Sequence, residues 1–490
     1  MIKPKHNKSI AQILKASAIM GSSSVVAIIA GIAKNKVIAL ILGPTGIGLF
    51  GLFMAVLTTA GTLAGMGLSN SGIRQIAAAN SDKDAGKLAL TRKALWTASL
   101  LLGFLGAFAL FFLREPVARL AIGKEGYGLT VAWLGLGVWA TIISGSQTAL
   151  LNGLRRLGDL ARINVMGSLV GLPVACLAVW FWNEDGVVVA LVSGTLTTLV
   201  ASWWFARKIE VPVVYIKIYW KDLLAPMRML FSLGTVFMLS SLMTVSVQFL
   251  VRVILTRDMG MEATGHFQAA WSISMLYLGF VLSAMGTDYY PRLSGVSQDH
   301  QATNVMVNEQ TEVALLLTGP IILGMLTLTP QVVNLLYSSA FTESISVLRW
   351  QILGDLFKVA SWPMGFILLA QGRSRLFFVA EFTWNATYLG LIYFGLHYWG
   401  IDSTGIAFLL AYILLFFVNW LIVYRLTRFT FTLQNIWLLL LFIVSAVLVF
   451  VCRLSSGVVP LIFGLMTTFA VGGYSIHRIF HSLGGLPWKK

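Results

Sequence analysis

Residues 94–113 read ALWTASLLLGFLGAFALFFL, a run of apolar and small side chains without a single charge. A bilayer core about 30 Å thick needs roughly 20 apolar helical residues to cross it. Because backbone groups in lipid must be satisfied within their own segment, this run predicts a transmembrane helix. Similar runs extend on both sides of it along the chain.

Apolar runs of this kind recur along the whole chain, and short loops join them. We count fourteen, which predicts an all-α polytopic membrane protein with about 14 transmembrane helices. The expected spans are residues 10–42, 46–79, 88–113, 127–150, 162–182, 186–206, 229–255, 265–290, 310–329, 348–370, 376–397, 403–424, 434–452 and 457–477.

The composition and the placement of charge agree with this class. Of the 490 residues, 57% are hydrophobic and only 11% are charged. The formal net charge of +16 could suggest a nucleic-acid partner, but we place 25 of the 35 Lys and Arg at cytoplasmic ends or loops. This is the positive-inside bias, and it predicts that both termini are cytoplasmic. We therefore expect no nucleic acid among the partners, and membrane lipids instead.

An internal repeat predicts two lobes. The segment LILGPTGIGLFG (40–51) resembles VILTRDMGMEATGHFQ (253–268), with Gly48 and Gly265 at equivalent positions. Six spans separate the copies, so both halves have the same orientation, as in a parallel repeat. The expected organisation is an N-lobe of spans 1–6 (residues 1–210), a C-lobe of spans 7–12 (211–425), and two extra spans with a cytoplasmic tail (426–490).

Two patterns that can signal chemistry are weak here. GIGLFG (46–51) fits the dinucleotide pattern GxGxxG, but that mechanism needs a soluble strand and a crossover unit, and apolar spans flank this copy. We expect a tight turn after Pro44 and close helix packing instead. None of the six histidines has metal-ligand spacing with a carboxylate or thiol. The sequence thus predicts no cofactor, no metal and no catalytic residues.

Ionisable side chains inside the spans carry more information, because each costs about 2.5–3.5 kcal/mol to insert. Lys34 and Lys36 lie late in the first span, and Arg252 lies near the outer end of the seventh. Each could reach the outer interface with its charge, or face a wet cavity as a substrate-binding cation. The apolar stretch VIALILG after Lys36 would bury both lysines.

A second group of ionisable residues suggests coupling or gating. Asp355 and Lys358 are three positions apart in the tenth span, so they can form a structural pair, or a switch whose lysine an anionic substrate borrows. Asp288 and Glu381 could couple transport to protons, or serve as interface residues beside nearby arginines. Arg74 is either a cytoplasmic anchor or a gating residue.

Three stretches resemble bacterial polysaccharide transporters, above all the Wzx-type O-antigen flippases of the multidrug/oligosaccharidyl-lipid/polysaccharide (MOP) superfamily. They are KNKVIALILGPTGIGLFGLF (34–53), GHFQAAWSISMLYLGFVLSAMGTDYYPRLSGVS (265–297) and LGDLFKVASWPMGFILLAQGRSRLFFVAEF (353–382). The elements YYPRLS and QGRSR are moderately specific to this family. Together the stretches cover about a sixth of the chain.

The resemblance implies a central cavity between two lobes. The implied activity is translocation of an oligosaccharide on undecaprenyl diphosphate from the cytoplasmic to the periplasmic leaflet of the bacterial inner membrane by alternating access. The family's cavity cations map by residue type onto Lys34, Lys36, Arg252 and Lys358. Partners implied are the lipid-linked oligosaccharide and the polysaccharide polymerase or assembly machinery.

Two alternatives stay open. Another transporter of the superfamily, either a lipid II flippase or a multidrug exporter, would share the fold. A membrane-embedded polysaccharide polymerase or ligase would need catalytic residues in a sizeable outer loop, and no outer segment exceeds about twenty residues. The sequence therefore favours a flippase over an enzyme.

Overall fold

The computed structural model describes residues 4–82, 84–123, 126–209, 220–453, 455 and 457–482. Within these ranges the secondary structure is helical, which confirms the all-α prediction. By Cα packing the chain divides into unit 1 (Met1–Gly265) and unit 2 (His266–Lys490). The division near residue 265 differs from the expected lobe boundary at 210, because α8 packs on α1, α2 and α3. The division into 1–210, 211–425 and 426–490 remains a prediction.

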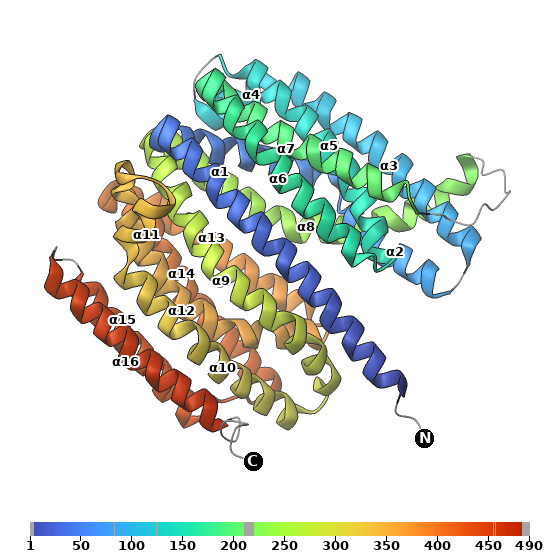
Figure 1. Cartoon of the computed structure of the whole chain (residues 1–490). Coiled ribbons are helices and arrows are strands. Elements are labelled where there is room, and N and C mark those ends of the chain that lie inside the picture. Colours follow the sequence, from blue (N-terminus) through green and yellow to red (C-terminus); the bar gives the residue numbers. More distant parts are fainter. Residues whose placement is uncertain are drawn as a thin grey trace. The chain divides into compact units, whose positions relative to one another are not determined.

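Unit 1 contains the first eight α-helices and the start of the ninth (Figure 1). They are α1 (Pro4–Gly65), α2 (Leu68–Ser81), α3 (Ala85–Phe112), α4 (Arg114–Ile122), α5 (Gly128–Gly153), α6 (Leu157–Trp182), the 3-10 turn η1 (Asn183–Asp185), α7 (Gly186–Ala206), α8 (Trp220–Asp258) and the first residues of α9 (Met261–Val296).

Unit 2 contains the rest of α9 and the remaining helices, ending with α15 and α16 side by side (Figure 1). They are α10 (His300–Thr327), α11 (Thr329–Leu336), the 3-10 turn η2 (Ser339–Phe341), α12 (Glu343–Ala370), α13 (Ser374–Trp399), α14 (Asp402–Thr427), α15 (Leu433–Cys452) and α16 (Val458–Ser482).

Ten helical stretches of the described residues are long and apolar enough to cross a membrane. Two of them each contain two helices: Met20–Gly65 includes a break at Gly43, and Leu157–Ala206 includes α6 and α7. Helices also occupy the expected spans at 265–290 and 376–397, but α9 and α13 are not among the ten. The chain is therefore a multi-pass membrane protein, while the count of fourteen spans stays a prediction.

Two local predictions in the first spans are wrong. The expected span 46–79 is interrupted, because α1 ends at Gly65 and both Met66 and Gly67 take left-handed backbone angles before α2. The expected turn after Pro44 lies instead at Gly43, whose φ of 64° and ψ of −158° suit glycine almost alone. Pro44 then starts the helix again, as proline at a first helical position does.

The glycines of the repeat pack backbone against backbone. A Cβ on Gly48 would overlap the carbonyl oxygen of Met261 and lie 2.9 Å from the nitrogen of Gly265. A Cβ on Gly265 would in turn overlap the carbonyl of Pro44. The predicted close packing of the GIGLFG segment is thus confirmed at Gly48. Gly61, by contrast, has no atom within 4 Å of its would-be Cβ.

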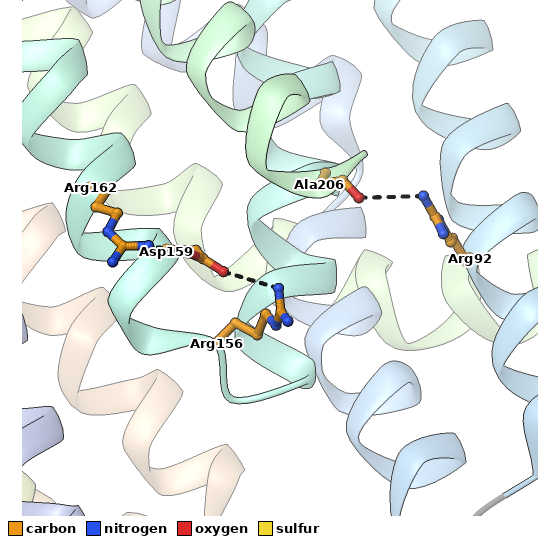
Figure 2. A network of polar contacts seen from close by, with 5 residues as sticks. All are labelled: Arg92, Arg156, Asp159, Arg162 and Ala206. Carbon is orange, nitrogen blue, oxygen red and sulfur yellow. Dashed lines mark hydrogen bonds and ion pairs between the residues drawn. The ribbon is translucent and has the colours of Figure 1, made fainter. Parts of the chain in front are cut away.

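Polar contacts hold the ends of several unit 1 helices (Figure 2). Asp159 at the start of α6 accepts from Arg156 at 3.3 Å and from Arg162 at 3.1 Å. Arg92 on α3 donates to the carbonyl of Ala206 at the end of α7, at 3.5 Å. The charge-based prediction of topology places these helix ends on the cytoplasmic side, where arginines act as interface anchors.

The two cores are built from small and aliphatic side chains, with more aromatic rings in unit 2. In unit 1 the buried residues include Ile76, Ala98 and Leu151. In unit 2, α12 and α14 come into close contact where Gly354 meets Phe408 and Leu409. Small residues at such contacts let helices approach in a bilayer, where dispersion replaces the hydrophobic effect as the packing force.

We predict that Gly48→Ala lowers the free energy of unfolding by about 1–3 kcal/mol, because the added methyl group must displace the Met261 carbonyl. Gly61→Ala is the matched control, since it adds the same methyl group to a helical glycine in open space. Thermal unfolding in detergent, followed by tryptophan fluorescence, measures both. Equal effects of the two substitutions would contradict the packing argument.

Candidate functional site

A cavity of about 270 Å³ lies inside unit 1 between α1, α6 and α7. Lys34 is its one charged lining residue among those the structure describes. The polar side chains of Asn164, Ser168 and Thr198 also line it, and the rest of the wall consists of small and aliphatic residues. Four of these are glycines: Gly31, Gly167, Gly171 and Gly194. Polar side chains therefore line part of a cavity between helices that are long and apolar enough to cross a membrane.

The hydrogen bonds of this wall leave it rich in acceptors. The Ser168 hydroxyl donates to the Asn164 carbonyl at 2.7 Å, and the Thr198 hydroxyl donates to the Gly194 carbonyl at 2.9 Å. Both oxygens keep lone pairs for a ligand hydroxyl. The ammonium of Lys34 lies 4.9 Å from the centre of the Phe50 ring, and no carboxylate of the described residues pairs with it. Such a wall suits a ligand that has both anionic oxygens and hydroxyl groups.

Two further predicted cations lie elsewhere in unit 1. Lys36 is two positions from Lys34, which puts the two side chains on different faces of α1. It is half-buried and makes an interaction of its own. Arg252 is buried on α8 and donates to Gln248, at 2.7 Å to the carbonyl and 3.1 Å to the side-chain oxygen. Of the three predicted cations in unit 1, Lys34 lines the cavity, and Lys36 and Arg252 are not among its described lining residues.

The predicted Asp355–Lys358 pair lies inside unit 2, but its members bind other partners. The fully buried carboxylate of Asp355 accepts from Ser274 at 3.0 Å and from Tyr277, both on α9. No ion pair joins it to Lys358 among the described residues. The ammonium of Lys358 instead contacts the sulfur of Met275 at 3.7 Å.

Aromatic rings complete the surroundings of Lys358. The ring centres of Tyr412 and Phe408 on α14 lie 5.6 Å and 5.8 Å from its ammonium. A cation held by ring faces and a sulfur atom is only weakly solvated compared with one beside a carboxylate. On α12, Gln351 is fully buried one turn before Asp355, and its amide has no hydrogen-bond partner among the described residues. One oxygen of Asp355 is in the same state.

The remaining predicted residues lie apart from this cluster or at its edge. Asp288 is exposed and pairs with Arg292 at 3.0 Å, which fits its interpretation as an interface residue. Arg74 is exposed on α2. Glu381 on α13 is half-buried, and neither Arg373 nor Arg375 forms an ion pair with it in the described part of the chain. Glu381 therefore keeps the coupling interpretation open, as a prediction.

Sequence reasoning missed the neutral partners of the cluster. Ser274, Tyr277 and Gln351 carry no charge, and each looks like an ordinary residue of an apolar span. The one available signal was the helical spacing of Gln351 and Asp355, which are four positions apart on one face. No group of three or more His, Cys, Asp or Glu in the described residues could hold a metal ion.

Comparisons with known proteins place the chain in a family. A family model described as "Polysaccharide biosynthesis protein" matches residues 37–346. The lipid III flippase of Escherichia coli (strain K12) is 26% identical over 374 residues, which cover 75% of this chain and 87% of that protein. A putative O-antigen transporter of Shigella flexneri is 22% identical over 362 residues, which cover 72% of this chain and 83% of that protein.

Solved structures with a similar fold include two transporters. The lipid II flippase MurJ in an inward closed conformation has a TM-score of 0.72 at 14% identity, covering 95% of this chain and all of that one. An inward-facing multidrug resistance MATE family transporter of the MOP superfamily has a TM-score of 0.69 at 17% identity, covering 81% of this chain and 95% of that one.

The fold is that of MOP-superfamily transporters, as predicted. The chain belongs to the polysaccharide biosynthesis protein family. The resemblance to polysaccharide flippases is confirmed by relatives named as flippases and transporters.

We predict that Tyr277→Phe lowers the free energy of unfolding by about 1–3 kcal/mol, because the buried Asp355 carboxyl loses a donor. Tyr393→Phe is the matched control, since Tyr393 is 60% exposed on α13. Thermal unfolding in detergent measures both. A loss in Tyr277→Phe no larger than that in Tyr393→Phe would show that the hydroxyl contributes nothing.

Proposed function

We propose that this protein is a flippase for an oligosaccharide carried on undecaprenyl diphosphate, with both termini in the cytoplasm of a bacterium. It moves the lipid-linked sugar from the cytoplasmic to the periplasmic leaflet of the inner membrane by alternating access. Family membership and the two flippase or transporter relatives support the class of activity. The observation that carries the substrate assignment is Lys34 in a polar cavity within the membrane-spanning helices.

The physical problem of this substrate is its charge. A diphosphate that enters a bilayer loses its hydration, and the protein must replace what is lost. The ammonium of Lys34 is a compact point charge on a flexible stem, which suits a phosphate that has to be released again. The hydroxyl oxygens of Ser168 and Thr198 in the same cavity suit sugar hydroxyls, because both keep acceptor lone pairs.

In unit 2, Lys358 supports a switch rather than a fixed ion pair. Its ammonium lies among Tyr412, Phe408 and Met275 while Asp355 is held by donors from α9. A phosphate that reached Lys358 would meet a cation without a fixed carboxylate partner. Asp355 on the same helix face would compete for that cation once the phosphate leaves. Asp355 then acts as the gating group of our proposal.

The alternatives explain the site less well. A drug exporter for cations would need a carboxylate in its cavity, and the cavity of unit 1 has Lys34 as its charged residue among those described. The relatives with the higher identities are named as a flippase and an O-antigen transporter. An enzyme would act through catalytic groups, whereas the proposed role needs only binding, release and a change of access.

We expect Lys34→Gln to lower the rate of translocation at least tenfold, because the diphosphate loses its cation in the cavity. The measurement is leaflet-resolved: a membrane-impermeant lectin reports how much lipid-linked oligosaccharide has reached the outer leaflet of cells that depend on the variant. Surface polysaccharide falls in parallel, and the lipid-linked oligosaccharide accumulates on the cytoplasmic side.

Arg228→Gln is the control for this substitution, since Arg228 is an exposed cation on α8 in the same unit. Its translocation rate should equal that of the unsubstituted protein. Both variants are first compared for the amount inserted in the membrane. Normal outer-leaflet arrival in Lys34→Gln at equal abundance would overturn the cationic-cavity mechanism.

The proposed switch predicts opposite changes in ligand affinity for substitutions of Lys358 and of Asp355. Lys358→Gln should weaken the binding of undecaprenyl diphosphate to the purified protein about fivefold or more, because a cation is lost. Asp355→Asn should strengthen binding by a similar factor, because the competing carboxylate is gone, and should slow translocation. Binding is measured by native mass spectrometry. A change of the same sign in both variants would contradict the switch.

A further inference from the structure

Two arginines meet in unit 2, away from the residues considered so far. Arg349 is the seventh residue of α12, and Arg453 directly follows the last residue of α15. Trp350, which follows Arg349 on α12, packs against Phe450 of α15, with ring centres 4.7 Å apart. The two helices are therefore in contact at this level. The two guanidinium groups are close enough for the charge of Arg453 to act on Arg349.

Nothing in the described part of the chain neutralises this pair. Neither arginine forms an ion pair with a carboxylate there. The Nε atoms of both are buried without a hydrogen-bond partner among the described residues. Arg453 is only 8% exposed. Arg349 is half-buried. Two neighbouring like charges that are shielded from water and have no counter-ion cost stability unless something else solvates them.

A purely structural role explains one of the two arginines. Arg453 stands at the carboxyl end of α15, where a cation interacts favourably with the helix dipole. Arg349 has no such explanation. It lies near the amino end of α12, far from the carboxyl end where the helix dipole favours a cation. The arrangement as a whole is what an anion with several oxygens requires, since guanidinium groups bind phosphate through paired hydrogen bonds.

We propose that Arg349 and Arg453 form a further phosphate site, distinct from Lys34 and Lys358, which holds the diphosphate of the lipid carrier at the membrane surface. Arg349 lies near one end of an apolar helical stretch and Arg453 directly follows the end of another. Spans of this length would place both arginines near the lipid head groups. The expected topology puts these ends on the outer side, where the proposed translocation delivers its product. The identity of the carrier rests on the proposed function; the phosphate chemistry rests on the two arginines.

The test uses the full-length protein in detergent. Arg349→Gln and Arg453→Gln are made one at a time, first in the unsubstituted protein and then in a background that carries both Lys34→Gln and Lys358→Gln. This background removes the cation of the unit 1 cavity and the cation beside Asp355, so binding at the two arginines is measured by itself. Arg425→Gln is the control, since Arg425 is an exposed arginine in the last turn of α14. The probes are undecaprenyl diphosphate, phosphatidylglycerol and inorganic pyrophosphate, and native mass spectrometry measures their binding.

The expected result has two parts. Each arginine substitution weakens the binding of undecaprenyl diphosphate at least tenfold in the background without the two lysines, and Arg425→Gln leaves it unchanged. Without ligand, each substitution raises the melting temperature by about 2–4 °C, because it removes the repulsion between two neighbouring like charges. A structural cation would behave in the opposite way, since its loss would lower the melting temperature.

Three outcomes would overturn the proposal. If binding is unchanged and the melting temperature falls, the arginines are structural. If phosphatidylglycerol binds as tightly as undecaprenyl diphosphate and depends on the same arginines, the site belongs to a resident phospholipid and not to the carrier. If pyrophosphate alone binds as tightly, the site is not a lipid site. The transport assay of Lys34→Gln tests the proposed function separately, so its failure is distinct from each of these.

Discussion

A charge inside a bilayer has no water to solvate it, and the rest of this structure depends on how the protein replaces that water. The chain keeps few charges in its spans, and each is handled differently. Lys34 faces a polar cavity, Arg252 binds the carbonyl and amide of Gln248, and Lys358 rests among rings and a sulfur atom. Asp355 takes two hydroxyl donors. A cation held by neutral groups, such as Lys358, can exchange those groups for an anionic ligand.

The sequence predicts the class of fold well because the bilayer allows few solutions. Apolar runs of about 20 residues must be helices, and helices cover the expected spans, with 46–79 and 310–329 each divided between two helices. The errors arise where backbone geometry, and not hydrophobicity, decides. Hydropathy alone cannot show the break at Met66 and Gly67, nor that Gly43 rather than the residues after Pro44 makes the kink. The break at Gly43 lies one residue before Pro44, after which the sequence predicts the turn.

The site was predictable only in part, for a related reason. Rarity in a span identifies charged residues such as Lys34 and Asp355, but not their partners. The hydroxyl of Tyr277 and the amide of Gln351 become significant only when folding buries them beside a carboxylate. The family-like element YYPRLS behaves similarly: Tyr289 is buried and donates to the carbonyl of Pro363, so its role is structural. Arg349 and Arg453 are 104 positions apart (453 − 349), and no local pattern joins them.

The contact between Gly48 and Gly265 has a mechanical consequence. Two helix surfaces whose side chains interdigitate separate only after many of those side chains have changed rotamer. Here the facing surfaces are bare peptide groups, the carbonyls of Pro44 and Met261 against glycine nitrogen and carbon atoms. No side chains interdigitate at this contact. Its separation would break short-range dispersion contacts all at once and would leave no side chain to be reset before the surfaces meet again.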